Sequence, residues 1–215
     1  MTKKERALLI IEKMKQMYPD AHCSLMYDDP LQLLIAVVLS AQCTDERVNK
    51  VTPALFERFP DLDSFCEAEP EEIAKYIHSC GFYNSKSKNI SALCKKIKSD
   101  FGGKVPDNIP DLTSLPGVGR KTANLICGDV YGTDGYVVDT HMIRISQRMG
   151  LASVKKDESN PALKIEMQLR KIVPESEAGD FCHRIVLHGR ALCSARKAKC
   201  EECALNEICA KKIKK

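Results

Sequence analysis

Two short stretches of the sequence carry residue types that could do chemistry. The first, 115–121, reads Leu-Pro-Gly-Val-Gly-Arg-Lys and predicts a tight glycine turn that opens a helix. A helix start points unpaired N–H groups and the positive end of its dipole outward, which suits a phosphate. Lys121 would lie on the first turn beside Arg120, where nearby positive charge favours the neutral amine. Lys121 is therefore a candidate amine nucleophile.

The turn in this stretch depends on Gly117 and Gly119. Both glycines can adopt positive φ and let another backbone approach closely. Region 112–127 thus predicts a helix-hairpin-helix, with a short first helix, the turn and a second helix from Arg120. Such a hairpin binds a nucleic-acid backbone without regard to sequence, because N–H groups contact phosphates rather than bases. A connection between two helices that binds no ligand is the alternative.

The second stretch, 137–141, reads Val-Val-Asp-Thr-His and supplies a carboxylate between apolar residues. Asp139 could cap a helix that runs through Arg148. The same carboxylate could stabilise developing positive charge or assist proton transfer. The residues alone leave both roles open.

Four cysteines near the C-terminus have the spacing of metal ligands. Cys193, Cys200, Cys203 and Cys209 give the pattern C-x6-C-x2-C-x5-C. Four thiolates without a histidine suit a [4Fe–4S] cluster, and structural zinc is the alternative. The loop between the first two cysteines carries cations that would either bind phosphates or balance the thiolate charge, namely Arg196, Lys197 and Lys199.

The composition and charge limit the classes of protein to which this sequence can belong. The 215 residues carry a net charge of +4, which is compatible with a polyanionic partner and does not establish one. The N-terminus has no apolar signal core, and the longest apolar run, 33–39, is too short to span a bilayer. We therefore expect a cytoplasmic protein without a membrane partner, whose seven other cysteines are reduced and packed as small apolar residues.

Helical periodicity dominates the chain. Apolar stripes recur at helical spacing, and 31–39 is apolar on nearly all sides, which predicts a helix buried within a domain. Asn160-Pro161 predicts a further helix start, while 136–138 is the one place where alternation favours a strand. We expect an all-α fold of roughly ten helices, with a solvated lysine-rich end at 211–215.

Taken in order, these motifs resemble the bacterial endonuclease III family. The resemblance rests on the hairpin 115–124, the segment 138–141 and the cysteine array, together with the stretches 40–45, 81–86 and 187–190. It covers essentially the whole chain. The family fold implies two helical domains flanking a DNA-binding cleft, with Lys121 on one wall and Asp139 on the other.

The resemblance also implies domain bounds and a cofactor. A six-helix domain at 22–133 would carry the hairpin, and 1–21 would join 134–215 in a second helical domain. The loop 193–209 of the second domain would hold a [4Fe–4S] cluster through its four cysteines.

The activity implied is base excision repair of oxidised pyrimidines in duplex DNA by a monomeric enzyme. Once the target nucleotide leaves the stack, Lys121 would attack C1′, displace the base and form a Schiff base, and β-elimination would cut the strand. Asp139 would assist these steps.

The family pattern extends to DNA contacts. Gln42 would fill the gap left by the extruded nucleotide, and Asp45 would lie near the lesion pocket. Phe82 stands where leucine is usual in the family, and its ring could still wedge between base steps. His141 would lie near the DNA.

Two other functions remain as alternatives. A monofunctional relative such as the mismatch adenine glycosylase shares the hairpin, aspartate and cluster, but it lacks the lysine and usually carries an extra C-terminal domain. The presence of Lys121 and the end of the sequence soon after Cys209 favour the lyase. A non-catalytic DNA-binding protein with structural zinc would need Lys121 only as a phosphate contact.

Overall fold

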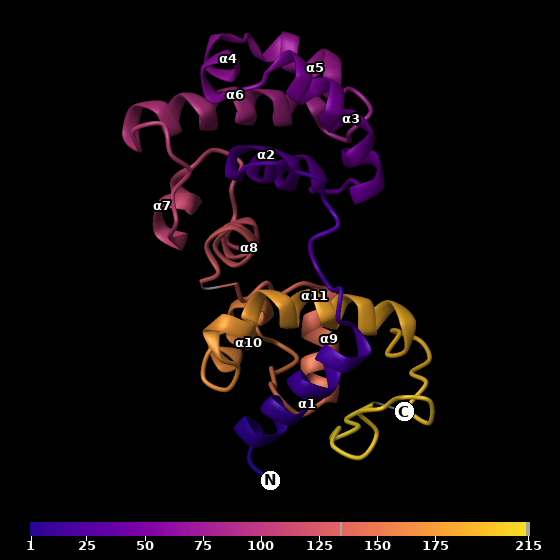
Figure 1. Cartoon of the computed structure of the whole chain (residues 1–215). Coiled ribbons are helices and arrows are strands. Elements are labelled where there is room, and N and C mark those ends of the chain that lie inside the picture. The colour runs from indigo at the N-terminus through magenta and orange to yellow at the C-terminus, as the bar shows by residue number, and fades with distance from the viewer. Residues whose placement is uncertain (134, 214–215) are drawn as a thin grey trace. The chain divides into compact units, whose positions relative to one another are not determined.

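The computed structural model describes residues 1–133 and 135–213, and within them every regular element is an α-helix (Figure 1). The prediction of an all-α fold is confirmed, with eleven helices in the described residues rather than roughly ten. The stretch 136–138 forms no strand, because it has no partner strand and Val137 N donates locally to Gly135 O at 2.9 Å. None of the described helices is long and apolar enough to cross a membrane. Asp134, at the edge of the expected second domain, and residues 214–215 of the lysine-rich end lie outside the described residues.

The chain divides into two compact units, each with its own apolar core. One unit is Cys23–Tyr131, and the other combines Met1–His22 with Gly132–Lys215. The expected domains, 22–133 and 1–21 with 134–215, stay a prediction.

The unit Cys23–Tyr131 is built around one buried helix. Its helices are α2 (Pro30–Ser40), α3 (Asp45–Arg58), α4 (Leu62–Glu67), α5 (Pro70–Ile77), α6 (Tyr83–Asp100), α7 (Ile109–Ser114) and α8 (Arg120–Tyr131). Asp29 caps α2, and the side chains 33–39 are all buried, which confirms the helix predicted for this run. Helix α2 packs against α3, α6 and α8. It therefore supports α8, the second helix of the hairpin.

This unit contains seven described helices, one more than the six expected. Pro70 accounts for the additional helix, because a proline disfavours helical geometry in the residue before it and divides α4 from α5.

The second unit contains α1 (Lys3–Met17), α9 (Thr140–Arg148), α10 (Pro161–Leu169) and α11 (Glu175–Ala191). Helix α1 begins with a capping box between Thr2 and Glu5 and buries Ala7, Ile10, Ile11 and Met14. Asn160 caps α10 by accepting from Leu163 N, which confirms the predicted helix start. Helix α11 packs against both α1 and α9.

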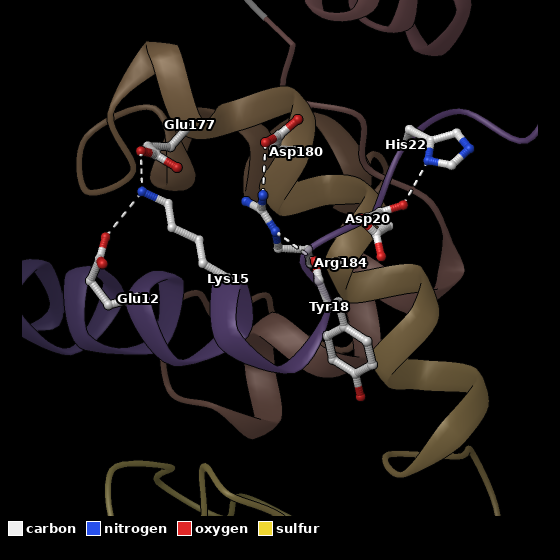
Figure 2. A network of polar contacts seen from close by, with 8 residues as sticks. All are labelled: Glu12, Lys15, Tyr18, Asp20, His22, Glu177, Asp180 and Arg184. Atoms are coloured by element: carbon white, nitrogen blue, oxygen red, sulfur yellow. Dashed lines mark hydrogen bonds and ion pairs between the residues drawn. The ribbon is translucent and has the colours of Figure 1, made fainter.

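Polar contacts fix the N-terminal helix to α11 (Figure 2). Lys15 Nζ lies 2.6 Å from Glu177 Oε1 and 3.0 Å from Glu12 Oε1, and these hydrogen bonds raise the pKa of Lys15. The buried Arg184 donates to Tyr18 O at 3.3 Å and to Asp180 Oδ2 at 2.8 Å. These bonds hold the N-terminal helix against α11, which is distant from it in the sequence.

Candidate functional site

The hairpin 112–127 has the predicted form. Helix α7 ends at Ser114, the turn follows, and α8 begins at Arg120. Gly117 has φ +77°, and a Cβ placed on it would lie 2.9 Å from Asn89 Nδ2, so both the backbone and the packing require glycine there. Arg120 and Lys121 are exposed on the first turn of α8.

Gly119 does not use the positive φ that a glycine permits. Its φ lies outside the left-handed region, and an added Cβ would meet no atom of the described chain within 4 Å. The turn is closed instead by ordinary hydrogen bonds, from Val118 N to Leu115 O and from Ala123 N to Gly119 O. A small residue at this open position leaves room for another molecule to approach the backbone.

Lys121 is exposed on the same turn. Among the described residues, no hydrogen bond or ion pair to its ammonium group occurs. Its amine is therefore accessible to a ligand placed at the start of α8.

Gln42 and Phe82 share an unusual backbone. They lie at φ +53° and φ +59°, and only one other non-glycine residue in the described chain, Lys211, has positive φ. This conformation costs a side-chain-bearing residue about 1–2 kcal/mol. Phe82 is nevertheless 67 % exposed, so burial of its ring does not offset that cost. Strain combined with an exposed aromatic ring is typical of a functional position.

The two strained residues lie close together. A Cβ placed on Gly81 would lie 3.6 Å from Gln42 O, so the loop before α3 adjoins the loop before α6. Asp45 follows at the start of α3, where Ser24 Oγ donates to its Oδ2 at 2.5 Å. The candidate residues Gln42, Asp45 and Phe82 thus belong to a single unit, as do the hairpin residues.

Asp139 lies in the other unit, where it caps α9 as predicted. Its Oδ1 accepts from Met142 N at 2.8 Å, and its backbone is extended. Its second carboxylate oxygen has no hydrogen bond among the described residues. One oxygen therefore fixes the side chain while the other is available to a ligand.

His141 is held on the same helix. Its Nδ1 lies 3.2 Å from an Arg144 guanidinium nitrogen, and Gly189 of α11 packs against its ring. The ring could not occupy this place if residue 189 carried a Cβ.

All four C-terminal cysteines line one cavity of about 30 Å³, together with Arg148 and His188. Cys203 Sγ lies 3.8 Å from His188 Nε2, and Arg148 donates to Cys193 Sγ at 3.4 Å. Burial, reinforced by the neighbouring thiolates, raises the pKa of Cys203 and of Cys209. Four thiolates at this place therefore require a compensating cation.

The donor set fits a thiolate-bound metal centre. The described residues contain no group of three or more ligands already arranged for a single metal ion. The fit rests on the four cysteines that line one cavity and on the hydrogen bond from Arg148 to the Cys193 sulfur.

The loop between the first two cysteines is closed by its own hydrogen bonds. Cys193 and Ala198 form an isolated antiparallel bridge, and Lys199 N donates to Leu192 O at 2.9 Å. Arg148 donates to Ser194 O and to Ala195 O from the side of α9. Arg196, Lys197 and Lys199 remain exposed, and a carboxylate oxygen of Glu202 lies 3.8 Å from Lys199 Nζ. The loop thus presents three cations on a defined backbone.

The sequence analysis missed two residues that position these features. Lys86 is 5 % exposed and donates to Leu39 O at 2.8 Å. Arg148 entered that analysis only as the end of a helix, yet it holds the loop after Cys193. Both donate to backbone carbonyls that are distant in the sequence. Such hydrogen bonds cannot be predicted from a local sequence pattern.

Comparison with known proteins agrees with this arrangement. Residues 35–175 match the family model described as HhH-GPD superfamily base excision DNA repair protein. The endonuclease III of Synechocystis sp. is 47 % identical over 209 residues, covering 97 % of this chain and 93 % of that protein. The endonuclease III of Escherichia coli K12 is 37 % identical over 211 residues, covering 98 % of each chain.

Solved structures give the same result. A trapped endonuclease III–DNA covalent intermediate matches with a TM-score of 0.85 at 40 % identity, covering 98 % of this chain and 97 % of that chain. A non-covalent endonuclease III–DNA complex matches equally well, with a TM-score of 0.85. The chain therefore belongs to the endonuclease III family of HhH-GPD superfamily base excision DNA repair proteins.

Proposed function

We propose that this protein removes oxidised pyrimidines from duplex DNA and then cuts the strand at the abasic site through a Schiff base on Lys121. Membership of the family makes the chain a DNA glycosylase and abasic-site lyase of base excision repair, which acts on DNA. The observation that carries the proposal is an accessible lysine on the first turn of the hairpin helix. The chain is similar to a protein that has been trapped in a covalent intermediate with DNA.

In the proposed reaction, Lys121 Nζ attacks C1′ of an extruded nucleotide, and the bond from C1′ to the damaged base breaks. The sugar ring opens to give a Schiff base, and loss of a C2′ proton then ejects the 3′ phosphate. Asp139 stabilises positive charge on the sugar through its available oxygen and assists the proton transfers. Gly117, Gly119 and Arg120 bind phosphates beside the nucleophile.

The other DNA contacts follow from the exposed residues already described. Gln42 fills the vacated position in the stack, Phe82 wedges between base steps, and Asp45 lines the lesion pocket. His141 and the loop cations Arg196, Lys197 and Lys199 bind the DNA from the second unit.

Borohydride trapping tests the nucleophile. We expect borohydride, added during reaction with a thymine-glycol or abasic duplex, to reduce the Schiff base to a stable protein–DNA adduct. Lys121→Ala should abolish the adduct while duplex binding persists, since binding depends on many phosphate contacts. Lys75→Ala, which changes an exposed lysine on α5, is the matched control and should leave the yield unchanged. An unchanged yield from Lys121→Ala would assign the chemistry to another amine.

We also propose that the metal centre is a [4Fe–4S] cluster held by Cys193, Cys200, Cys203 and Cys209. The cluster would cross-link α11, the basic loop and the chain end. A brown protein that absorbs near ~400 nm and contains iron and sulfide would support this assignment. A colourless protein with bound zinc would contradict it.

The proposed location is the cytoplasm, where the protein would act as a monomer on the nucleoid. Reduced cysteines are consistent with this location, because none of the eleven forms a disulfide in the structure.

A further inference from the structure

Two cysteines outside the C-terminal group lie in the two loops that carry Gln42 and Phe82. Cys43 follows Gln42 directly, between α2 and α3, and Cys80 lies between α5 and α6, close before Phe82. Both loops are tight turns, with Cys43 N donating to Ser40 O at 3.0 Å and Cys80 N to Ile77 O at 2.8 Å. The loops adjoin because a Cβ placed on Gly81 would lie 3.6 Å from Gln42 O, and the Cys43 thiol acts electrostatically on Cys80.

The surroundings assign different roles to the two thiols. Cys80 is 1 % exposed, and burial together with Cys43 raises its pKa to about 11, so it remains a thiol at neutral pH. Cys43 is partly exposed, so a small oxidant can reach it first. The buried ammonium of Lys86 interacts with both sulfurs. Peroxide reacts with the thiolate form of a cysteine.

We propose that Cys43 and Cys80 form a reversible disulfide on exposure to peroxide, and that this bond joins the Gln42 loop to the Phe82 loop and slows lesion excision. The effect on excision rests on the proposed function, in which both loops enter the DNA, whereas the bond itself does not.

The oxidation balances with hydrogen peroxide as the oxidant. The Cys43 thiolate attacks one peroxide oxygen, the O–O bond breaks, and the released hydroxide takes a proton to become water. Cys80 then attacks the resulting Cys43 sulfenic acid, loses its own proton and expels a second water. Two thiols and one peroxide thus give one disulfide and two waters, and the peroxide accepts two electrons.

The disulfide would restrict the strained backbone on both sides. Each of its cysteines is next to, or close to, a residue at positive φ, and the bond would fix the two sulfurs about 2 Å apart. Gln42 and Phe82 could then no longer adjust independently to the duplex. A displacement of about 1 Å can lower a catalysed rate by up to roughly 10²-fold, so we expect excision to slow by about tenfold or more.

The test begins with the reduced, cluster-loaded protein. It is treated with hydrogen peroxide, alkylated with N-ethylmaleimide and digested with trypsin and an aspartate-specific protease. This digest separates Cys43 from Cys23, and Cys80 from Cys66 and Cys94. Mass spectrometry should find a Cys43–Cys80 linked peptide that dithiothreitol removes, while absorbance near ~400 nm shows that the cluster is intact.

Excision is measured on the same samples under single-turnover conditions. The linked wild-type protein should lose about tenfold or more of its rate and recover it with dithiothreitol. Cys43→Ala should keep its rate with and without peroxide. Cys66→Ala is the matched control and should behave as the wild type, since Cys66 on α4 lies near Cys94 on α6.

Absence of the linked peptide, or an unchanged rate in fully linked protein, would overturn the proposal. Equal peroxide inactivation of Cys43→Ala would also overturn it. Failure of the proposed function would look different, because the reduced protein would then excise no lesion while the linked peptide could still form.

Discussion

Asp139 both caps α9 and is the proposed catalytic carboxylate, and two substitutions separate these roles. Asp139→Asn keeps an oxygen where Oδ1 accepts from Met142 N and removes only the negative charge. Asp139→Ala removes both the acceptor and the charge.

The expected stability changes follow from the cap. Asparagine and aspartate cap helices almost equally well, so Asp139→Asn loses only the interaction of its charge with the helix dipole, about 0.3–1 kcal/mol. Asp139→Ala loses the cap in addition, about 1 kcal/mol more. In a protein of this size about 1 kcal/mol shifts Tm by roughly 2–4 °C, so the alanine variant should melt several degrees below the wild type.

The expected activity changes are different. Both variants should lose roughly 10²- to 10⁴-fold in excision of thymine glycol under single-turnover conditions, because both lack the group that moves protons and stabilises charge. Binding to a duplex with an abasic analogue should change little. Asp29→Asn is the matched control: Asp29 caps α2 through a similar bond, 2.9 Å to Gln32 N, and its substitution should leave excision unchanged.

The reasoning would be refuted if Asp139→Asn lowered the excision rate only as much as its small loss of stability accounts for. Near-normal excision by Asp139→Asn, with a large defect only in Asp139→Ala, would mean that the residue acts as a helix cap alone.

Four further substitutions test other parts of the site. Phe82→Gly should raise the free energy of unfolding by about 1 kcal/mol in denaturant titration, because it relieves positive φ at an exposed position, and yet excision from duplex DNA should fall because the wedge is lost. Lys86→Met should lower the free energy of unfolding by about 1–3 kcal/mol, because it leaves the buried Leu39 carbonyl without its donor; unchanged stability would show that water replaces the bond. Gly119→Ala should leave thermal stability unchanged and weaken duplex binding in an anisotropy titration, whereas Gly189→Ala should lose about 1–3 kcal/mol of stability because its Cβ meets α9.

Local patterns predicted the local parts of this structure. The cap at Asp139, the start of α10 at Asn160 and the turn at Gly117 each depend on residues a few positions apart, so their geometry follows from the neighbouring sequence. The buried helix α2 was predictable for the same reason, because its apolar run has no polar face.

Gly119 shows the limit of that reasoning. Both glycines of the turn permit positive φ, but only Gly117 adopts it. Whether a glycine serves the fold or an incoming ligand depends on the space around it, and this space is set by residues such as Asn89 that are distant in sequence.

The packing around the Gln42 and Phe82 loops could not be predicted from sequence either. Lys86 reads as one more helical lysine, yet it lies buried beneath the end of α2 and donates to Leu39 O. Cys43 and Cys80 read as unrelated apolar cysteines until α3, α5 and α6 bring their loops together.

The same packing explains how two strained residues persist side by side. The positive φ of Gln42 and Phe82 together costs the fold about 2–4 kcal/mol. Because the Phe82 ring is 67 % exposed, its burial contributes little stability to offset that cost. The buried Lys86 donates to Leu39 O near the end of α2, and the Gly81 backbone lies close to Gln42 O, so packing restrains both loops. The two side chains are therefore already held in place before DNA binds. Because of this, binding costs them little conformational entropy. A bond between Cys43 and Cys80 would act on this same preorganised element, which is why a single oxidation there should affect excision more than overall stability.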